Sequence, residues 1–269
     1  MPLIQADWLY NHLNASNLVI LDASIKKVTD TSHDLTSVQI PNARFFDIIN
    51  VFSDLNHPFP NAVPSEEQFT NEARNLGINT DSAIVVYDDK GIYSSARAWW
   101  LFKAFGHENV AVLDGGLPEW IKFNYKTESK QKFESQPGDF IGKYNPQYFK
   151  FFDDIKRSID NTDYLILDAR SAERFQGLVN EPREGLRSGH IPNSKSLPYT
   201  ELFIENKMKD WNELISIFNK FANSNKELIF SCGSGITACI LALGANIAGY
   251  EKLSVYDGSW TEYGTLTNQ

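Results

Sequence analysis

Short, continuously apolar runs alternate along this chain with longer segments whose apolar residues recur at helical spacing. The apolar runs predict strands at 18–23, 83–88, 109–116, 164–170, 227–232 and 252–259. Helical spacing predicts helices at 65–77, 94–107, 211–222 and 237–250, with serine and glycine at several of their ends. Strands that are apolar on both faces and alternate with helices are typical of parallel sheets covered on both sides, so we predict an α/β fold.

The pattern also repeats, which indicates a duplication. LVILDAS (18–24) returns as LILDAR (165–170), IPNA (40–43) as IPNS (191–194), and LDGGLPEW (113–120) as YDGSWTEY (256–263). Asp114 and Asp257 are 143 residues apart, and the same offset places Asp89 on Cys232. Four landmarks in one order predict two similar halves, each a mainly parallel sheet flanked by helices on both faces.

The segment between the halves is polar and charged and contains Pro-Gly, as surface linkers do (126–140). We therefore expect an N-terminal domain at 1–125, a linker at 126–147 and a C-terminal domain at 148–269. A cleft between two such domains is a preferred place for a ligand.

The composition and net charge of the chain argue against some classes of function. The chain has 269 residues, 42% of them hydrophobic, and 34 acidic against 25 basic residues, giving a net charge of −9. Such a charge argues against a general nucleic-acid-binding surface, although a few arginines could still form an anion pocket. Two cysteines are too few for a secreted disulfide scaffold, and we see neither a signal peptide nor an apolar run of the roughly 18–20 residues that a membrane span needs. We expect a cytoplasmic protein with no membrane partner.

The strongest chemical signal is the loop that follows the strand at 227–232. It reads Cys232-Gly233-Ser234-Gly235-Ile236-Thr237 and leads directly into a helix. The carboxyl edge of a parallel sheet is where open α/β folds bind ligands, and two glycines allow successive backbone N–H groups to form an anion-binding nest. The helix terminus adds about 0.3–1 kcal/mol for a negative charge. These features favour a reactive thiolate at Cys232.

Other interpretations of the cysteines remain. A lone cysteine after a strand is more often a buried structural residue, and we expect that role for Cys239, which lies within an apolar helix. A cysteine in an N–H nest is also typical of phosphatases, but that chemistry needs an arginine where this chain has Ala238.

Several short sequence motifs, taken together, resemble those of the tandem-domain rhodanese family, in its mercaptopyruvate sulfurtransferase branch. They are FFDI (45–48), DGGLPEW, GHIPNS (189–194), CGSGITA and YDGSW (256–260), and they cover nearly the whole chain. The resemblance implies two tandem rhodanese-like domains, of which only the second is catalytic, and it implies that neither a metal nor an organic cofactor is required. It assigns catalysis to Cys232 and Ser234, and the surrounding loop to the substrate site (Gly233, Gly235, Ile236, Thr237). The thiosulfate branch has cationic side chains where this chain has Gly233 and Ser234.

Two arginines in RSAERFQGLVNEPREG (170–185) match those that grip substrate in the mercaptopyruvate branch, namely Arg174 and Arg183. The chemistry is consistent, because a guanidinium can bind the carboxylate and ketone oxygens of mercaptopyruvate in bidentate fashion. Each of these two arginines could instead form an ordinary ion pair. For the nearby Arg170, the resemblance implies a structural role.

One feature departs from the family. Relatives use an Asp and a His of the first half to relay protons to the loop serine, whereas this chain has Ile49 and Asn61 where those two would be expected. Nearby residues are weaker candidates for the role (Asp47, Asp54, His57). The relay is therefore in doubt.

These observations favour a sulfurtransferase. It would move sulfur from the small anion 3-mercaptopyruvate to a thiol or cyanide through a Cys232 persulfide, releasing pyruvate. The thiol acceptor would be a thioredoxin-like protein or a small thiol. The alternatives are a thiosulfate sulfurtransferase on the same fold and a non-enzymatic rhodanese-like binding module.

Overall fold

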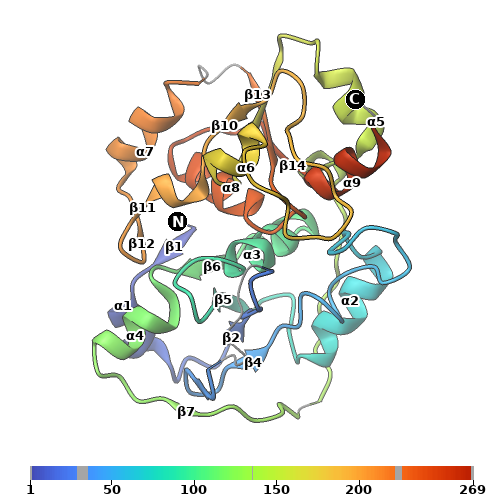
Figure 1. Ribbon diagram of the computed structural model, residues 1–269. Helices are drawn as coiled ribbons and strands as arrows, with labels where there is room; N and C mark the ends of the chain where they lie inside the picture. Colours follow the sequence, from blue (N-terminus) through green and yellow to red (C-terminus); the bar gives the residue numbers. More distant parts are fainter. Residues whose placement is uncertain (1, 29–35, 135, 222–225, 268–269) are drawn as a thin grey trace. The chain divides into compact units, whose positions relative to one another are not determined.

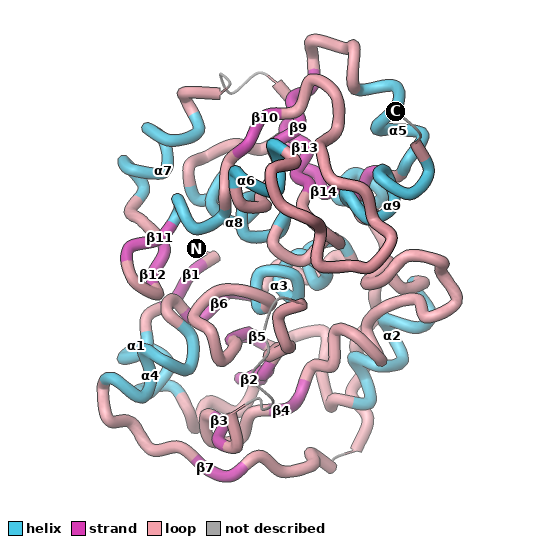
Figure 2. Tube along the Cα trace, in the orientation of Figure 1, coloured by secondary structure: helices cyan, strands magenta, loops and turns pink. Residues whose placement is uncertain are grey.

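The chain forms two compact units (Figures 1 and 2). The computed structural model describes residues 2–28, 36–134, 136–221 and 226–267. The N-terminal unit comprises Met1–Asp54, Val63–Asn145 and Glu205–Met208, and the C-terminal unit comprises Leu55–Ala62, Pro146–Ile204 and Lys209–Gln269. Residues 55–62 thus belong to the C-terminal unit although they precede most of the N-terminal one.

The N-terminal unit is built on a five-stranded sheet of order β1-β6-β5-β2-β4, in which every pair is parallel. Helices α1 and α4 cover one side of this sheet, and α2 and α3 cover the other (Figure 1). The elements are β1 (Leu3–Ile4), α1 (Ala6–His12), β2 (Leu18–Asp22), β4 (Arg44–Phe45), α2 (Glu66–Asn75), β5 (Ala83–Tyr87), α3 (Ser95–Ala104), β6 (Val110–Leu113) and α4 (Gly116–Lys122).

The C-terminal unit repeats this plan with a sheet of order β10-β9-β13-β14-β8, again entirely parallel. In Figure 1, α5 and α9 lie on one side of its strands and α7 and α8 on the other. The elements are β8 (Phe149–Lys150), α5 (Phe152–Ser158), β9 (Tyr164–Asp168), α6 (Ala172–Gln176), β10 (Lys195–Ser196), α7 (Trp211–Phe218), β13 (Glu227–Ser231), α8 (Ala238–Ile247), β14 (Leu253–Tyr256) and α9 (Ser259–Leu266).

Short elements connect these layers. They are β3 (Val38–Gln39), β7 (Glu128–Ser129), the 3-10 turns η1 (Pro146–Tyr148) and η2 (Tyr199–Leu202), β11 (Phe203–Ile204) and β12 (Lys207–Met208). The expected linker at 126–147 contains β7, which pairs antiparallel with β3. It also contains Phe140, whose ring packs edge-on against Phe69 and Phe102 in the N-terminal unit.

Equivalent strand positions face equivalent helices in the two units. Ile20 and Val85 pack with α1 and α4, whereas Ile166 and Ile229 pack with α5 and α9. Successive side chains of a strand alternate between faces, so the central strands are buried on both sides. This burial explains their continuous apolar runs and confirms the predicted α/β architecture of two parallel sheets.

Helix boundaries follow local capping chemistry. The Ser65 side chain accepts the Gln68 N–H at the start of α2, and Asp210 and Glu213 form a reciprocal capping box at the start of α7. Among the described residues, no helix is long and apolar enough to cross a membrane.

Candidate functional site

Cys232 is the first residue after β13, at the carboxyl edge of the C-terminal sheet. The last residue of that strand, Ser231, pairs with Asp168 at the end of β9, and α8 begins at Ala238, six residues after Cys232. Cys232 is only 2% exposed and Cys239 is fully buried, and both are reduced thiols. The structure therefore places Cys232 at the base of the strand-to-helix loop, where the sequence predicted it.

The loop is tied to the start of α9 by a serine that the sequence analysis missed. Ser259 Oγ accepts the backbone N–H groups of Cys232 and Gly235, each at 3.1 Å, and donates to the Tyr256 carbonyl at 2.9 Å. Ser259 is fully buried and has a φ of +50°, which is unusual for a residue other than glycine. In the sequence, only its position in the repeated motif YDGSW pointed to this serine.

Several loop amides remain available to an anion. Within the described part of the chain, the backbone N–H groups of Gly233, Ser234, Ile236 and Thr237 have no hydrogen-bond acceptor. Gly235 has a φ of +77°, which turns the backbone between them. Unsatisfied amides near a buried thiol are costly unless a ligand binds them, so this loop is suited to hold a negative charge.

The two predicted arginines converge on Gly233. A Cβ atom built on this glycine would lie 3.2 Å from Arg174 Nη2 and 3.6 Å from Arg183 Nη1. A side chain here would crowd the Arg174 guanidinium and contact that of Arg183, whereas glycine leaves both next to the loop backbone. The structure brings Arg174 and Arg183 together beside the cysteine loop.

Glu181 organises one of these arginines. Its buried carboxylate accepts from Arg174 Nε at 3.2 Å and from Arg174 Nη2 at 2.5 Å, and it also accepts from Arg170 Nη1 at 2.7 Å. Arg170 is fully buried and also pairs with Asp168. Burial alone would lower the pKa of Arg170, but the two carboxylates outweigh it and raise that pKa. Arg170 is thus a structural residue that supports Glu181, which in turn holds Arg174.

Ser234 is contacted by two donors. Asn61 Nδ2 lies 3.0 Å from both the Ser234 carbonyl oxygen and Ser234 Oγ, and Arg183 Nη2 donates to Ser234 Oγ at 3.0 Å. Asn61 belongs to the 55–62 segment of the C-terminal unit and is 8% exposed. The position where a histidine was expected therefore carries a side chain that holds the loop serine.

The weaker relay candidates are engaged locally. Asp47 Oδ1 accepts the N–H groups of Ile49 and Asn50, and His57 Nδ1 lies 3.2 Å from the Phe59 nitrogen. The role of Asp54 stays a prediction. Among the residues that the structure describes, no cluster of His, Cys, Asp and Glu could hold a metal ion.

The sequence profile of the rhodanese-like domain matches this chain twice, at residues 5–123 and 152–265. The chain belongs to the rhodanese family. The two matches fall on the two halves of the duplicated pattern.

The chain is similar to proteins that are named 3-mercaptopyruvate sulfurtransferases. It is 38% identical to the 3-mercaptopyruvate sulfurtransferase of Mus musculus, over 97% of this chain and 91% of the relative. It is also 38% identical to thiosulfate/3-mercaptopyruvate sulfurtransferase 1, mitochondrial, of Arabidopsis thaliana, over 98% of this chain and 76% of the relative. Among solved structures, it matches the crystal structure of SseA from Escherichia coli, a 3-mercaptopyruvate sulfotransferase, with a TM-score of 0.87, 34% identity and coverage of 97% and 99%.

The N-terminal rhodanese unit has a carboxylate in the equivalent loop. Tyr87 ends β5 opposite Asp22, as Ser231 ends β13 opposite Asp168, so Asp88 is the counterpart of Cys232. The constant offset of 143, which pointed to Asp89, is wrong by one residue here because the connections between strands differ in length.

The Asp88 carboxylate occupies the anion-binding nest formed by the backbone of its own loop. This fully buried carboxylate accepts five hydrogen bonds at 2.7–3.0 Å, all from the loop that follows and the start of α3. The donors are the N–H groups of Lys90, Tyr93, Ser94 and Ser95 and the Ser95 hydroxyl. The N-terminal loop thus binds an anion that is part of the chain, whereas the Cys232 loop leaves four amides open.

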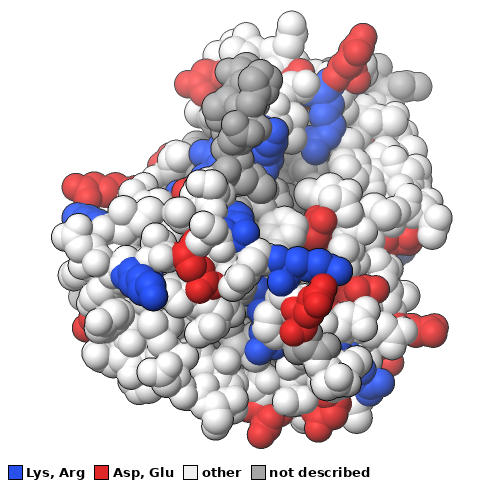
Figure 3. All heavy atoms as spheres, turned by 90° about the horizontal axis from the view of Figure 1, so that it is seen from below, with Lys and Arg blue, Asp and Glu red and all other residues white. Residues whose placement is uncertain are grey.

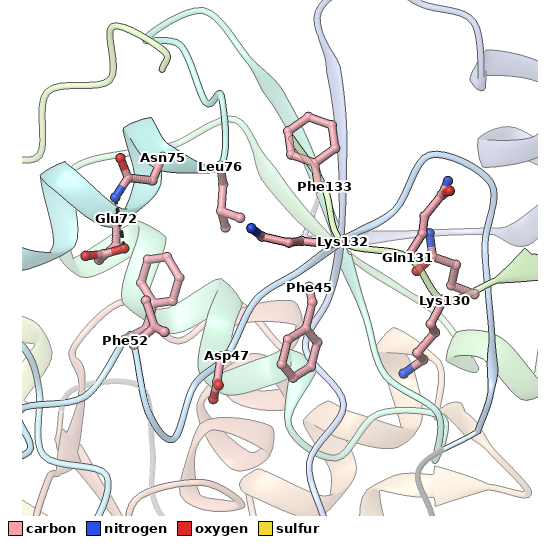
Figure 4. Close-up of a pocket in the computed structure, with 12 residues that line it drawn as sticks. Phe45, Asp47, Phe52, Glu72, Asn75, Leu76, Lys130, Gln131, Lys132 and Phe133 are labelled. Atoms are coloured by element: carbon pink, nitrogen blue, oxygen red, sulfur yellow. Dashed lines mark hydrogen bonds between the residues drawn. The ribbon is translucent and has the colours of Figure 1, made fainter. Parts of the chain in front are cut away.

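The N-terminal rhodanese unit also has a cavity of about 580 Å³ between β4, α2 and the segment at 130–133 (Figure 4). Phe45, Phe52, Leu76 and Phe133 surround it, and the Lys132 side chain points among them (Figure 4). No cysteine lines this cavity, so it lacks the nucleophile of the Cys232 loop.

Proposed function

We propose that this chain is a sulfurtransferase that takes sulfur from 3-mercaptopyruvate as a persulfide on Cys232. The observation that carries the proposal is the contrast between the two loops. One is closed by the Asp88 carboxylate, and the other combines a thiol, open amides and two guanidinium groups. The second loop is therefore suited to an anionic sulfur species and an anionic substrate, and its relatives are named for this activity.

The reaction is a nucleophilic displacement at sulfur. The Cys232 thiolate attacks the sulfur of mercaptopyruvate, a new S–S bond forms, and the C–S bond breaks with its electron pair passing to the enolate of pyruvate. The persulfide hydrogen comes from the substrate thiol, and its loss supplies the proton that the enolate carbon takes up. The open loop amides stabilise the resulting persulfide anion.

The two arginines act on the organic part of the substrate. Arg174 and Arg183 bind the carboxylate and the ketone oxygen, and their charge opposes the negative charge that develops as the enolate forms. Glu181 keeps Arg174 in place before substrate arrives, which reduces the ordering cost of binding.

Gly233 favours mercaptopyruvate over thiosulfate. A cationic side chain at this position, as in the thiosulfate branch, would meet Arg174 and Arg183 within contact distance. Like charges so close are unfavourable, so this loop obtains its positive charge from outside the 232–237 segment. Thiosulfate is a second candidate donor, because the Arabidopsis thaliana relative carries both names.

The proposed acceptor is a thiol, either a small thiol or a thioredoxin-like protein, with cyanide as an assay acceptor. Nucleic acid is not a proposed partner, because basic and acidic side chains are interspersed on the face drawn in Figure 3 rather than gathered into one basic surface. We also propose a cytoplasmic location, where a reactive thiol stays reduced.

The decisive experiment is intact-mass measurement after mixing the protein with 3-mercaptopyruvate. We expect a gain of one sulfur atom together with release of an equal amount of pyruvate. Thiosulfate, tested in parallel, should load the protein more slowly at equal concentration. If thiosulfate loads the protein faster, thiosulfate is its preferred sulfur donor. If neither compound adds sulfur, the proposal that this chain is a sulfurtransferase is wrong.

The arginines give a second prediction. Arg174→Ala or Arg183→Ala should lower kcat/KM for mercaptopyruvate about 10- to 100-fold, since a hydrogen bond to a charged group contributes about 1.5–3 kcal/mol. Steady-state pyruvate formation measures this. Arg157→Ala is the control, because that guanidinium lies on the exposed face of α5 with Asp154. Unchanged kinetics in both site variants would remove these arginines from the substrate site.

A further inference from the structure

The hydrogen-bond arrangement of Ser234 fixes which way its hydroxyl can act. A hydroxyl group has one hydrogen to donate and two lone pairs that accept. Asn61 and Arg183 both donate to Ser234 Oγ at 3.0 Å, so both lone pairs are occupied. The only remaining capacity of this oxygen is to donate its hydrogen.

The orientation of the Asn61 amide is determined by its second contact. Its terminal nitrogen also lies 3.0 Å from the Ser234 carbonyl oxygen, which can only accept a hydrogen bond. The group that faces the loop must therefore be the NH₂ end of the amide, and the oxygen end faces away from the loop. Asn61 acts on Ser234 as a donor at both atoms.

Neither partner of Ser234 Oγ can take a proton from it. An amide nitrogen is not basic, and a guanidinium stays charged and offers no acceptor. The same Arg183 group also lies beside Gly233, so Ser234 Oγ is next to the proposed substrate position.

We propose that Asn61 is a positioning residue that makes Ser234 a fixed hydrogen-bond donor to the ketone oxygen of the substrate. This inference rests on the proposed function. The Ser234 hydrogen stabilises the enolate oxygen as the C–S bond breaks, and it stays on Ser234 throughout. The proton that the enolate carbon needs comes from the substrate thiol, so no proton passes through Ser234 and no histidine is required behind it.

The test separates the two half-reactions. Loading of Cys232 by mercaptopyruvate forms an enolate, whereas discharge of the persulfide to cyanide does not. Rapid-mixing measurements of each step would use Asn61→Ala, Asn61→Asp, Ser234→Ala and the double variant of Asn61→Ala with Ser234→Ala. Asn61→Asp keeps the shape of the side chain but replaces its NH₂ donor by an acceptor, which would draw the Ser234 hydrogen away from substrate.

We expect Ser234→Ala to slow loading about 10- to 100-fold, somewhat less than the loss of a main oxyanion donor. Asn61→Ala and Asn61→Asp should slow loading about tenfold, and all variants should discharge to cyanide within about twofold of the unaltered protein. The double variant should load within about twofold of Ser234→Ala, because the effect of Asn61 on loading passes through that hydroxyl even though Asn61 also contacts the Ser234 carbonyl.

Three results would overturn the inference. Asn61→Ala could load at the normal rate, it could slow loading and discharge equally as a general structural defect does, or its effect could add to that of Ser234→Ala. If the unaltered protein acquires no sulfur from mercaptopyruvate, the proposed function fails and this inference fails with it, whereas the three results above leave the proposed function intact.

Discussion

Cys232→Ser is expected to abolish sulfur gain from 3-mercaptopyruvate and to lower pyruvate formation by roughly three orders of magnitude or more, as removal of a covalent nucleophile does. The serine oxygen occupies nearly the same volume at the base of the loop, so the Ser259 contacts to the backbone of residues 232 and 235 should persist. The loss would therefore reflect chemistry rather than folding. Intact mass and steady-state pyruvate formation measure the two effects.

Cys239→Ser is the matched control for this experiment. Cys239 is the second residue of α8, is fully buried, and its thiol donates to the Gly235 carbonyl at 3.3 Å. A serine can make the same bond within the helix, so this variant should still gain one sulfur atom. Sulfur gain in Cys232→Ser, or its loss in Cys239→Ser, would show that the persulfide forms elsewhere.

Asp88→Ala is expected to have the largest effect on stability, about 3–5 kcal/mol, because it removes a buried charge and leaves its donors unsatisfied. This carboxylate accepts four backbone N–H groups and the Ser95 hydroxyl, and all five donors lose this acceptor in the variant. Urea unfolding followed by tryptophan fluorescence should show the transition of the N-terminal unit at a lower urea concentration.

The neighbouring carboxylate serves as the control for that prediction. Asp89 accepts from the Lys90 ammonium at 2.8 Å, and these side chains are 8% and 18% exposed, whereas Asp88 accepts five hydrogen bonds. Asp89→Ala should therefore shift the transition less than Asp88→Ala. If Asp88→Ala and Asp89→Ala destabilise the protein equally, the interpretation that the Asp88 carboxylate is the anion bound by this loop is wrong.

Much of the architecture could be predicted because it is encoded locally. Runs such as LVILD and YLILD are apolar up to their final aspartate because both faces of their strands are buried, and the order of such runs with helices indicates parallel sheets. The Cys232 loop could be recognised for a similar reason, since its glycines and the following helix are contiguous in the sequence.

Contacts between distant residues could not be predicted in the same way. Ser259 reaches the loop from 27 residues away, and nothing in its neighbours requires the positive φ that aims its hydroxyl. Glu181 lies within a segment that was noticed for its arginines, but its role depends on burial that only packing reveals. The position of Asp88 was missed by one residue because a single offset cannot describe two halves with unequal connections.

The internal carboxylate has a consequence for how a duplicated protein can evolve. Backbone amides that point toward one place are stabilised when a negative group accepts their hydrogen bonds. The N-terminal copy, which has no cysteine, retains the strand-to-helix turn because Asp88 is a permanent occupant. The C-terminal copy instead fixes its turn through the buried hydroxyl of Ser259, so the remaining loop amides can stay open to a substrate without loss of the turn.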